Sequence, residues 1–171
     1  MSLLLYLMRH GIAQDPGPGM DDADRALTAE GAEKTTAVAK GLRASEVRLD
    51  AILSSPLRRA QETARLAGTV LAPDLEVLLR PALSGGVAAS DIAAGLRPPH
   101  GARQVLVVGH QPDLGELASF LLTGSARTCP LPFKKAAVAA IEVDGLPPRR
   151  TGVLHWFLTP GQLRGIAGSK K

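Results

Sequence analysis

One stretch near the beginning of the chain decides the fold, and it reads Leu3-Leu4-Leu5-Tyr6-Leu7-Met8-Arg9-His10-Gly11. Its first six residues are continuously apolar rather than alternating, which predicts a strand buried on both faces of a sheet. Such strands are typical of parallel sheets that helices cover on both sides. The strand ends abruptly at Arg9 and His10, so two side chains capable of phosphate binding or proton transfer follow directly from a buried element.

Further along the chain, apolar segments alternate with segments of good helix formers. Strands are predicted at residues 49–53, 76–79 and 104–108, and helices at 29–42, 57–66, 87–96 and 114–123. Two further β-like segments, 136–143 and 153–158, are expected to form a hairpin at one edge of the sheet. This alternation indicates an α/β fold: a three-layer α/β/α sandwich with a mainly parallel central sheet.

Particular residues predict where the helices begin and end. Thr28 is expected to cap helix 29–42, and a serine before Pro56 to cap the next helix, with Pro56 in its first position. Gly68 and Gly124 are expected to end the second and fourth helices.

The length of 171 residues fits one domain, expected at residues 1–165, and residues 166–171 are expected to be a frayed basic tail. There are 20 Lys and Arg against 16 Asp and Glu, giving a net charge of +4, and the basic residues are spread along the chain. We interpret this charge as attraction for anionic small molecules or phosphoproteins. Aromatic residues make up only 3%, which argues against nucleic acid as a partner.

Several features point away from secretion and membranes. The apolar run at residues 3–8 is too short for a signal peptide and ends in charge. No stretch approaches the roughly 20 apolar residues of a membrane span. Cys129 is the single cysteine and cannot form a disulfide within the chain, which fits a reducing compartment. A cytoplasmic protein that does not bind membranes is therefore expected.

Polar side chains follow three of the predicted strands. Arg9 and His10 end the first, Ser55 and Arg59 follow the second, and His110 follows strand 104–108. Because the carboxyl ends of parallel strands meet at one edge of a sheet, these side chains are expected to converge there. Arginine binds phosphate in a bidentate manner, and histidine acts as a nucleophile or proton carrier near neutral pH. The pattern predicts a pocket for a phosphoryl group.

The chain resembles the histidine phosphatase superfamily, the branch related to phosphoglycerate mutases. Four elements in family order carry the resemblance: Arg9-His10-Gly11, Leu27-Thr28-Ala29-Glu30-Gly31, Ser55-Pro56-Leu57-Arg58-Arg59-Ala60-Gln61-Glu62-Thr63-Ala64 and Val107-Val108-Gly109-His110. They cover roughly residues 3–120. The small size and the lack of a large inserted cap domain are most similar to the SixA-type phosphohistidine phosphatases.

The resemblance implies a role for each matched position. His10 would attack phosphorus and become a transient phosphohistidine, which water then hydrolyses. Gly11 would leave space for close approach of the phosphoryl group. Arg9 and Arg59 would hold its oxygens, and His110 would act as a second catalytic histidine and donate a hydrogen bond to the same group.

Two arginines fall outside this core set. Arg58 occupies a variable position of its motif and is expected to face solvent or the outer part of the substrate. Arg25, just before the second element, resembles a recurring basic position of the SixA-type branch and is a candidate substrate contact. A solvated loop arginine is the alternative interpretation.

The sequence departs from the family at the proton donor. Ala82 stands where many relatives carry a carboxylate, and Gln111 and Pro112 follow His110. Asp15 and Asp113 are the remaining candidates. Without a donor an alkyl phosphate would be a poor substrate, because general acid catalysis is typically worth about 10²–10⁴-fold. Phosphohistidine has a better leaving group, so this gap favours phosphohistidine or aryl-like phosphates as substrates.

The sequence argues against two other kinds of active site, that of a cysteine phosphatase and a metal centre. Cys129 is followed six residues later by Lys135 rather than the arginine that cysteine phosphatases need. No cluster has metal-ligand spacing, and the expected mechanism needs neither metal nor cofactor. The hypotheses are therefore a phosphatase for protein phosphohistidine, a phosphatase for small phosphate monoesters and, from another class, a non-catalytic module that binds phosphoproteins. Its partner is a phosphorylated protein or a small phosphorylated molecule.

Overall fold

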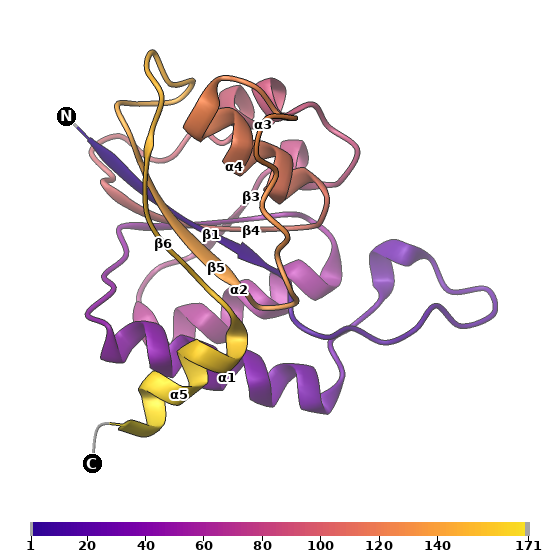
Figure 1. Ribbon diagram of the computed structural model, residues 1–171. Helices are drawn as coiled ribbons and strands as arrows, with labels where there is room; N and C mark the ends of the chain where they lie inside the picture. The colour runs from indigo at the N-terminus through magenta and orange to yellow at the C-terminus, as the bar shows by residue number, and fades with distance from the viewer. Residues whose placement is uncertain (1, 170–171) are drawn as a thin grey trace.

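The computed structural model describes residues 2–169 and places a six-stranded sheet between two helical layers (Figure 1). The elements in chain order are β1 (Leu3–Arg9), the 3-10 turn η1 (Asp22–Asp24), α1 (Ala29–Ala44), β2 (Ala51–Ser54), α2 (Arg58–Leu71), β3 (Val77–Leu79), the 3-10 turn η2 (Pro81–Leu83), α3 (Ala89–Gly95), β4 (Gln104–Gly109), α4 (Asp113–Thr123), β5 (Val138–Val143), β6 (Val153–Leu158) and α5 (Pro160–Ser169).

The strand order is β3-β2-β4-β1-β5-β6. The first four of these strands are parallel, whereas β5 runs antiparallel to β1 and β6 antiparallel to β5. The predicted sheet is therefore confirmed, including the hairpin at one edge. Strand β1 lies inside the sheet, and Leu5, Leu7 and Met8 are fully buried. Its continuous apolar run follows from helices covering both faces.

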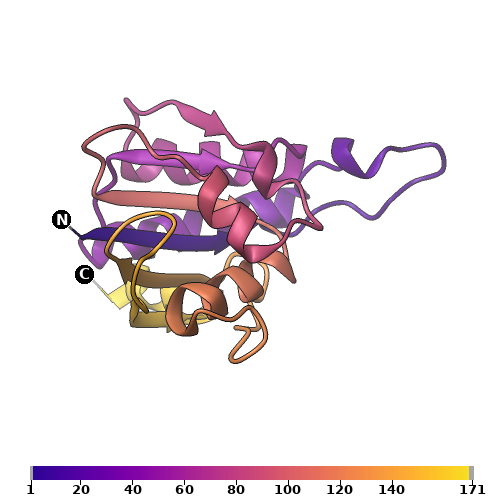
Figure 2. The ribbon, with the colours of Figure 1, turned by 90° about the horizontal axis from the view of Figure 1, so that it is seen from above.

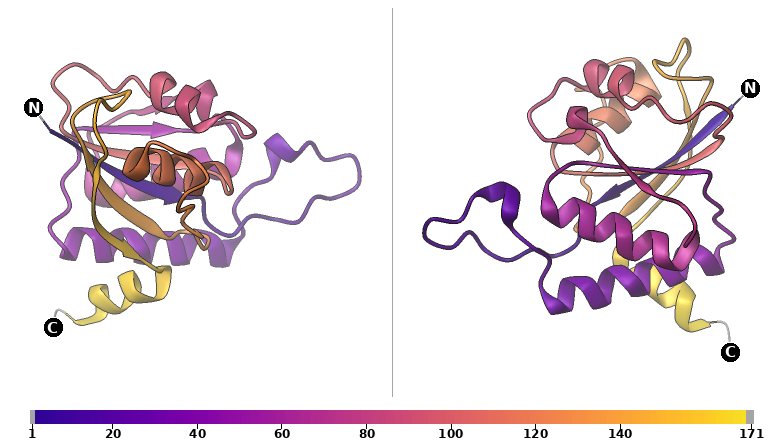
Figure 3. Two further views of the ribbon diagram at one scale, coloured as in Figure 1. Left: turned by 45° about the horizontal axis from the view of Figure 1, so that its top comes forward. Right: turned by 180° about the vertical axis from the view of Figure 1, so that it is seen from behind.

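Helices α1, α2 and α5 cover one face of the sheet and α3 and α4 the other (Figures 1 and 3). Alternate residues of β1 point into the two cores: Leu5 and Leu7 pack on the α3–α4 side, and Tyr6 and Met8 on the α1–α2–α5 side. The three-layer sandwich is confirmed, and no large cap domain is present among the described residues. Over the same residues, no helix is long and apolar enough to cross a membrane.

The segment between β1 and α1 projects from the body of the protein (Figure 2). Its base is closed by a β-bridge between Ala13 and Leu27 and by a 2.8 Å hydrogen bond from the Gln14 N–H to the Ala26 carbonyl. Thr28 caps α1 as predicted, since its hydroxyl accepts the N–H of Gly31 at 2.9 Å.

Helix α2 corrects two expectations. It begins at Arg58 rather than at Pro56, and Ser55 accepts the N–H of Leu57 at 3.2 Å without being the cap residue. It also continues beyond Gly68 to Leu71. A Cβ at Gly68 would lie 2.9 Å from Cδ1 of Ile52, so the glycine permits close helix–sheet packing instead of ending the helix. Gly124, by contrast, ends α4 as predicted, with φ of 78°.

The expectation of a frayed tail from residue 166 is wrong for residues 166–169, which continue α5; Lys170 and Lys171 lie outside the described residues. Glycine lowers the intrinsic helix propensity of this segment. Packing overrides that cost, since Leu163 is fully buried and Ile166 packs on the same core. A Cβ at Gly41 would overlap the main chain of Leu163, so α1 and α5 touch through backbone.

Candidate active site

The ends of β1, β4 and β2 are joined by hydrogen bonds at one edge of the sheet. Arg9 pairs with Gly109, and the His10 N–H donates to the Gly109 carbonyl at 3.1 Å. The Ser55 N–H donates to the Val108 carbonyl at 3.0 Å. Residues from three distant parts of the sequence thus meet at the carboxyl ends of three adjacent strands, as the strand pattern predicted.

His10 is held as a neutral, oriented imidazole. It is 7% exposed, and its Nδ1 lies 2.7 Å from the Gly11 carbonyl. A carbonyl only accepts hydrogen bonds, so Nδ1 carries the proton and Nε2 keeps a free lone pair. Burial is the main reason that the pKa of His10 is lowered to about 3. The hydrogen bond to the Gly11 carbonyl opposes this shift, and the nearby charges of His110, Arg59 and Arg9 add to it. The imidazole is therefore a potential nucleophile at neutral pH.

His110 lies against His10, with ring centroids 5.1 Å apart. Its Nε2 is 2.7 Å from the Ser55 hydroxyl oxygen, which also accepts the Leu57 N–H. This arrangement favours donation of the Ser55 proton to Nε2, which leaves the proton of His110 on Nδ1. Nδ1 is buried without a partner among the described residues, so it is available as a donor. Burial and then the charge of Arg59 lower the pKa of His110 to about 4.

Arg59 binds a residue of the projecting segment. Its side chain is 9% exposed; Nη1 donates to the Asp22 carbonyl at 2.6 Å and Nη2 to Asp22 Oδ2 at 2.9 Å. The Asp22 side chain is 60% exposed and also accepts from Arg25, and these two arginines lower the pKa of the Asp22 carboxyl. An anionic oxygen therefore already sits on the guanidinium predicted to bind phosphate.

Arg58 differs from its neighbour as expected. Its side chain is 58% exposed and pairs along the helix with Glu62 at 2.8 Å. Glu62 also accepts the Leu27 N–H at 2.7 Å, so it ties α2 to the base of the projecting segment.

Arg9 is anchored behind His10. Its Nη1 donates to the Phe133 carbonyl at 2.9 Å, and its Nε is buried without a partner among the described residues. Burial lowers the pKa of the guanidinium, and its charge acts on both His10 and His110. Arg9, His10, Arg59 and His110 are thus brought together as predicted.

Thr63 is a connection that sequence reasoning did not assign. Its hydroxyl accepts the Gly11 N–H at 3.0 Å and donates to the Arg59 carbonyl at 2.7 Å. Gly11 has a structural requirement of its own, since a Cβ there would overlap the hydroxyl of Thr35. The glycine therefore allows α1 to pack against the nucleophile loop, whatever space it also leaves for phosphate.

The remaining candidates lie outside this group of four residues. Arg25 donates from Nε to the Gln14 carbonyl at 2.7 Å and so stiffens the projecting segment. Asp15 is an exposed residue of that segment. Asp113 begins α4 and accepts the Val87 N–H at 3.4 Å. Asp22, which the sequence did not single out, is the carboxylate found on the site's arginine.

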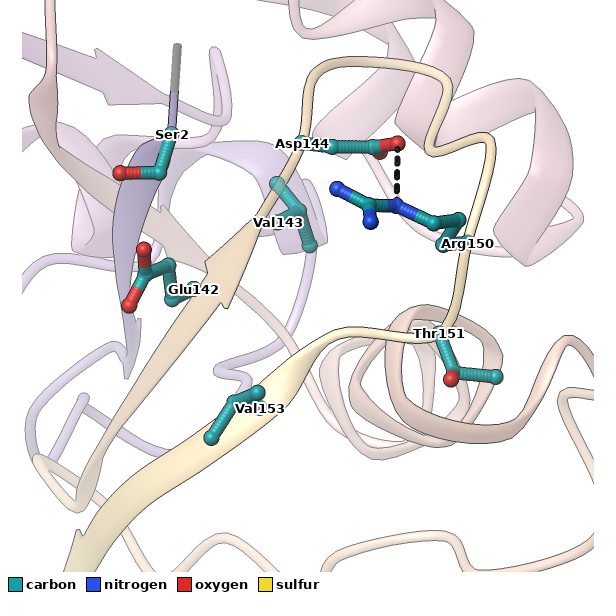
Figure 4. A pocket seen from close by; sticks show the side chains of 7 residues that line it. All are labelled: Ser2, Glu142, Val143, Asp144, Arg150, Thr151 and Val153. Carbon is teal, nitrogen blue, oxygen red and sulfur yellow. Dashed lines mark hydrogen bonds and ion pairs between the residues drawn. The ribbon is translucent and has the colours of Figure 1, made fainter.

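A hollow at the opposite end of the sheet has a different character (Figure 4). It is lined by Glu142 and Asp144, and its Arg150 faces Asp144 at 3.4 Å. Two carboxylates and one paired cation disfavour a phosphoryl group there. Within residues 2–169, no group of three or more potential ligands is placed to hold a metal ion.

Comparison with known proteins agrees with this geometry. Residues 5–84 match the family described as the histidine phosphatase superfamily (branch 1). An uncharacterized protein of Picosynechococcus is 38% identical over 80% of this chain and 83% of its own length. Phosphohistidine phosphatase SixA of Escherichia coli is 28% identical over 94% and 96% of the two chains. A solved structure of the protein histidine phosphatase SixA with tungstate superposes with a TM-score of 0.82 and 27% identity, covering 94% and 99%.

Proposed function

Because the chain belongs to branch 1 of the histidine phosphatase superfamily, we propose that it hydrolyses phosphoryl groups through a covalent phosphohistidine on His10. The observation that carries this proposal is the neutral His10 imidazole. Its proton is on Nδ1, its Nε2 is free, and it lies beside two arginines and a second histidine.

The reaction has two balanced steps. The Nε2 lone pair attacks phosphorus, the bond to the leaving group breaks, and the leaving group takes its electron pair. Water then attacks phosphorus, the P–N bond breaks and its electron pair returns to Nε2, and the product leaves as dihydrogen phosphate, which carries both hydrogens of the water. Arg9, Arg59 and the Nδ1–H of His110 stabilise the charge on the phosphoryl oxygens in both steps.

We favour protein phosphohistidine as the substrate. The carboxylate on the site's arginine, Asp22, has a lowered pKa and is ionised at neutral pH, so it is poorly suited to donate a proton. The imidazole of phosphohistidine can leave already protonated and needs no such donor. The similarity to SixA supports the same substrate class.

The test measures phosphate release, without added metal, from a phosphohistidine-bearing carrier domain, para-nitrophenyl phosphate and an alkyl phosphate. Fast release from the carrier with slow cleavage of the alkyl ester is expected. Comparable alkyl ester turnover would move the substrate to small phosphate monoesters and imply a proton donor. Acid-quenched reactions with labelled substrate test the intermediate: label should appear on the wild-type protein and not on His10→Ala. Phosphate binding without any release would indicate a binding module instead.

A further inference from the structure

A second cavity of about 410 Å³ adjoins the segment that carries the nucleophile. It lies between α1, α5 and the segment that precedes β5. The Ala136 N–H donates to the carbonyls of both Arg9 and His10, at 3.1 and 3.2 Å, which ties that segment to the end of β1. The cavity therefore opens beside the catalytic pocket, and Arg9 and Gly11 are among its lining residues.

The lining is strongly basic. Its cationic side chains come from four separate parts of the fold: Arg9, Lys34, Lys134, Lys135 and Arg164. None of the described residues that line it is acidic. Lys34 is paired with Glu30 on the exposed side of α1, whereas Lys134, Lys135 and Arg164 form no salt bridge with any residue from 2 to 169. Cations gathered without a counter-charge repel one another and attract an anion.

A buried polar group at the wall also supports a ligand in this cavity. Thr35 lines the cavity and is fully buried, and its hydroxyl has no hydrogen-bond partner in the described part of the chain. Unsatisfied buried polar groups are rare in folded proteins and often mark a place where a ligand or ion completes the site.

We propose that this cavity is a second anion-binding site that takes a phosphate or carboxylate group, separate from the pocket around His10. The anion is either an acidic group of the phosphorylated substrate or a free anion in solution. The site itself does not rest on the proposed reaction.

Nuclear magnetic resonance with inorganic phosphate as the probe tests the site. The amides of Gly31 and Thr35 report on the cavity, and those of Ser55 and His110 on the catalytic pocket. Lys134→Ala/Lys135→Ala removes two exposed cations of the cavity, and Lys40→Ala/Arg43→Ala removes two exposed cations elsewhere on α1. We expect phosphate affinity at the cavity to fall roughly tenfold or more in the first variant. It should change less than about twofold in the second.

Repeating the titration in Arg59→Ala separates the two sites. The Gly31 and Thr35 signals should still respond to phosphate when those of Ser55 and His110 respond weakly. The proposal is overturned if the cavity signals do not respond, if they lose their response in Arg59→Ala, or if Lys134→Ala/Lys135→Ala binds phosphate there like the wild type.

Turnover then identifies the source of the anion. If Lys134→Ala/Lys135→Ala has a raised KM for the phosphohistidine carrier and an unchanged KM for para-nitrophenyl phosphate, the site binds an acidic group of the protein substrate. Unchanged kinetics with both substrates, with binding lost, would assign it to a free anion. If no substrate is turned over, the proposed function fails while the titration still decides whether the cavity binds anions.

Discussion

Arg59 and Asp22 form a two-point contact in which one guanidinium binds both the carbonyl and the carboxylate of the aspartate. The carboxylate oxygen therefore takes one N–H group of the guanidinium that we propose as a phosphate ligand. Because two anions repel each other, binding of phosphate at Arg59 requires Asp22 to withdraw or to share the guanidinium. Apart from Arg59, the projecting segment that carries Asp22 is held at its base, by the bridge between Ala13 and Leu27 and the hydrogen bond from Leu27 to Glu62, and by the contacts of its own Arg25.

Replacing Asp22 should therefore strengthen phosphate binding. Asp22→Asn keeps an oxygen acceptor but removes the competing charge, and we expect the inhibition constant for phosphate to fall by roughly threefold to tenfold at low salt. Asp24→Asn, in the same short 3-10 turn, is the matched control and should have little effect. Weaker phosphate binding in Asp22→Asn would mean that Asp22 orients Arg59 rather than competing with its ligand.

The two adjacent arginines of α2 should behave very differently. Arg59→Ala removes a buried charge that faces the histidines, and kcat/KM should fall about 10²–10³-fold. Arg58→Ala breaks only an exposed pair with Glu62, so it should change kcat/KM less than about threefold. Steady-state kinetics on both variants check this, and similar losses would contradict the assignment of Arg59.

His10→Ala should separate catalysis from binding. Without the Nε2 nucleophile, turnover should fall by at least about 10³-fold, while phosphate affinity falls only modestly because the arginines remain. The measurements are single-turnover kinetics and isothermal titration with phosphate. A loss of binding as large as the loss of rate would show that His10 acts mainly as a ligand.

Gly11 and Thr35 should be energetically coupled. Gly11→Ala places a methyl group on the Thr35 hydroxyl, and overpacking of this kind typically costs about 1–3 kcal/mol. Because Thr35→Ala removes the hydroxyl, Gly11→Ala should cost at least about 1 kcal/mol less in that background. Urea unfolding of the four proteins completes the cycle, and additive effects would exclude this contact as the reason for glycine.

The buried histidine pair should make stability depend on pH between about 6.5 and 4. In this range the unfolded chain protonates both residues, whereas folded His10 and His110 stay neutral down to pKa values of about 3 and 4. The unfolded state then binds more protons than the folded state. The free energy of unfolding therefore decreases as the pH is lowered, by up to about 1.4 kcal/mol per histidine per pH unit.

Urea unfolding at pH 7.0, 5.5 and 4.5 measures this dependence. His10→Gln/His110→Gln should flatten it, and His100→Gln, which removes an exposed loop histidine, should not. Equal slopes in all three proteins would show that the pair is not held neutral.

The strand pattern predicted most of the sheet and the four central site residues, because buried parallel strands leave a continuous apolar signal that ends where the polar site begins. Helix ends were harder. The sequence predicts a helix end at Gly68, which lies inside α2, because close packing on Ile52 and a helix terminus both select glycine. Helix α5 is not predicted from the sequence, because it is stabilised by packing of Leu163 and Ile166 on the core beside α1, which no local propensity encodes.

Within the site, the sequence predicted the groups that we propose bind phosphate, but not the residues that hold those groups in place. Ser55 and Thr63 stand inside a recognised motif, yet their hydrogen bonds to His110 and Gly11 depend on the pairing of β2 with β4 and on the packing of α2 against the sheet. Asp22 lies in a segment rich in aspartate, glycine and proline, where nothing in the pattern distinguishes it from Asp21 or Asp24. Only the folded structure distinguishes Asp22, because it brings the projecting segment into contact with Arg59.

The single hydroxyl of Thr63 has a wider consequence for precision. It accepts the Gly11 N–H and donates to the Arg59 carbonyl, so one atom fixes the position of the loop that carries His10 relative to the helix that carries Arg59. A small displacement of α2 along the sheet would therefore move the His10 loop and Arg59 together. The alignment of His10 with Arg59 is therefore set locally by these two hydrogen bonds, and not by the chain that joins Gly11 to Thr63, 52 positions later in the sequence.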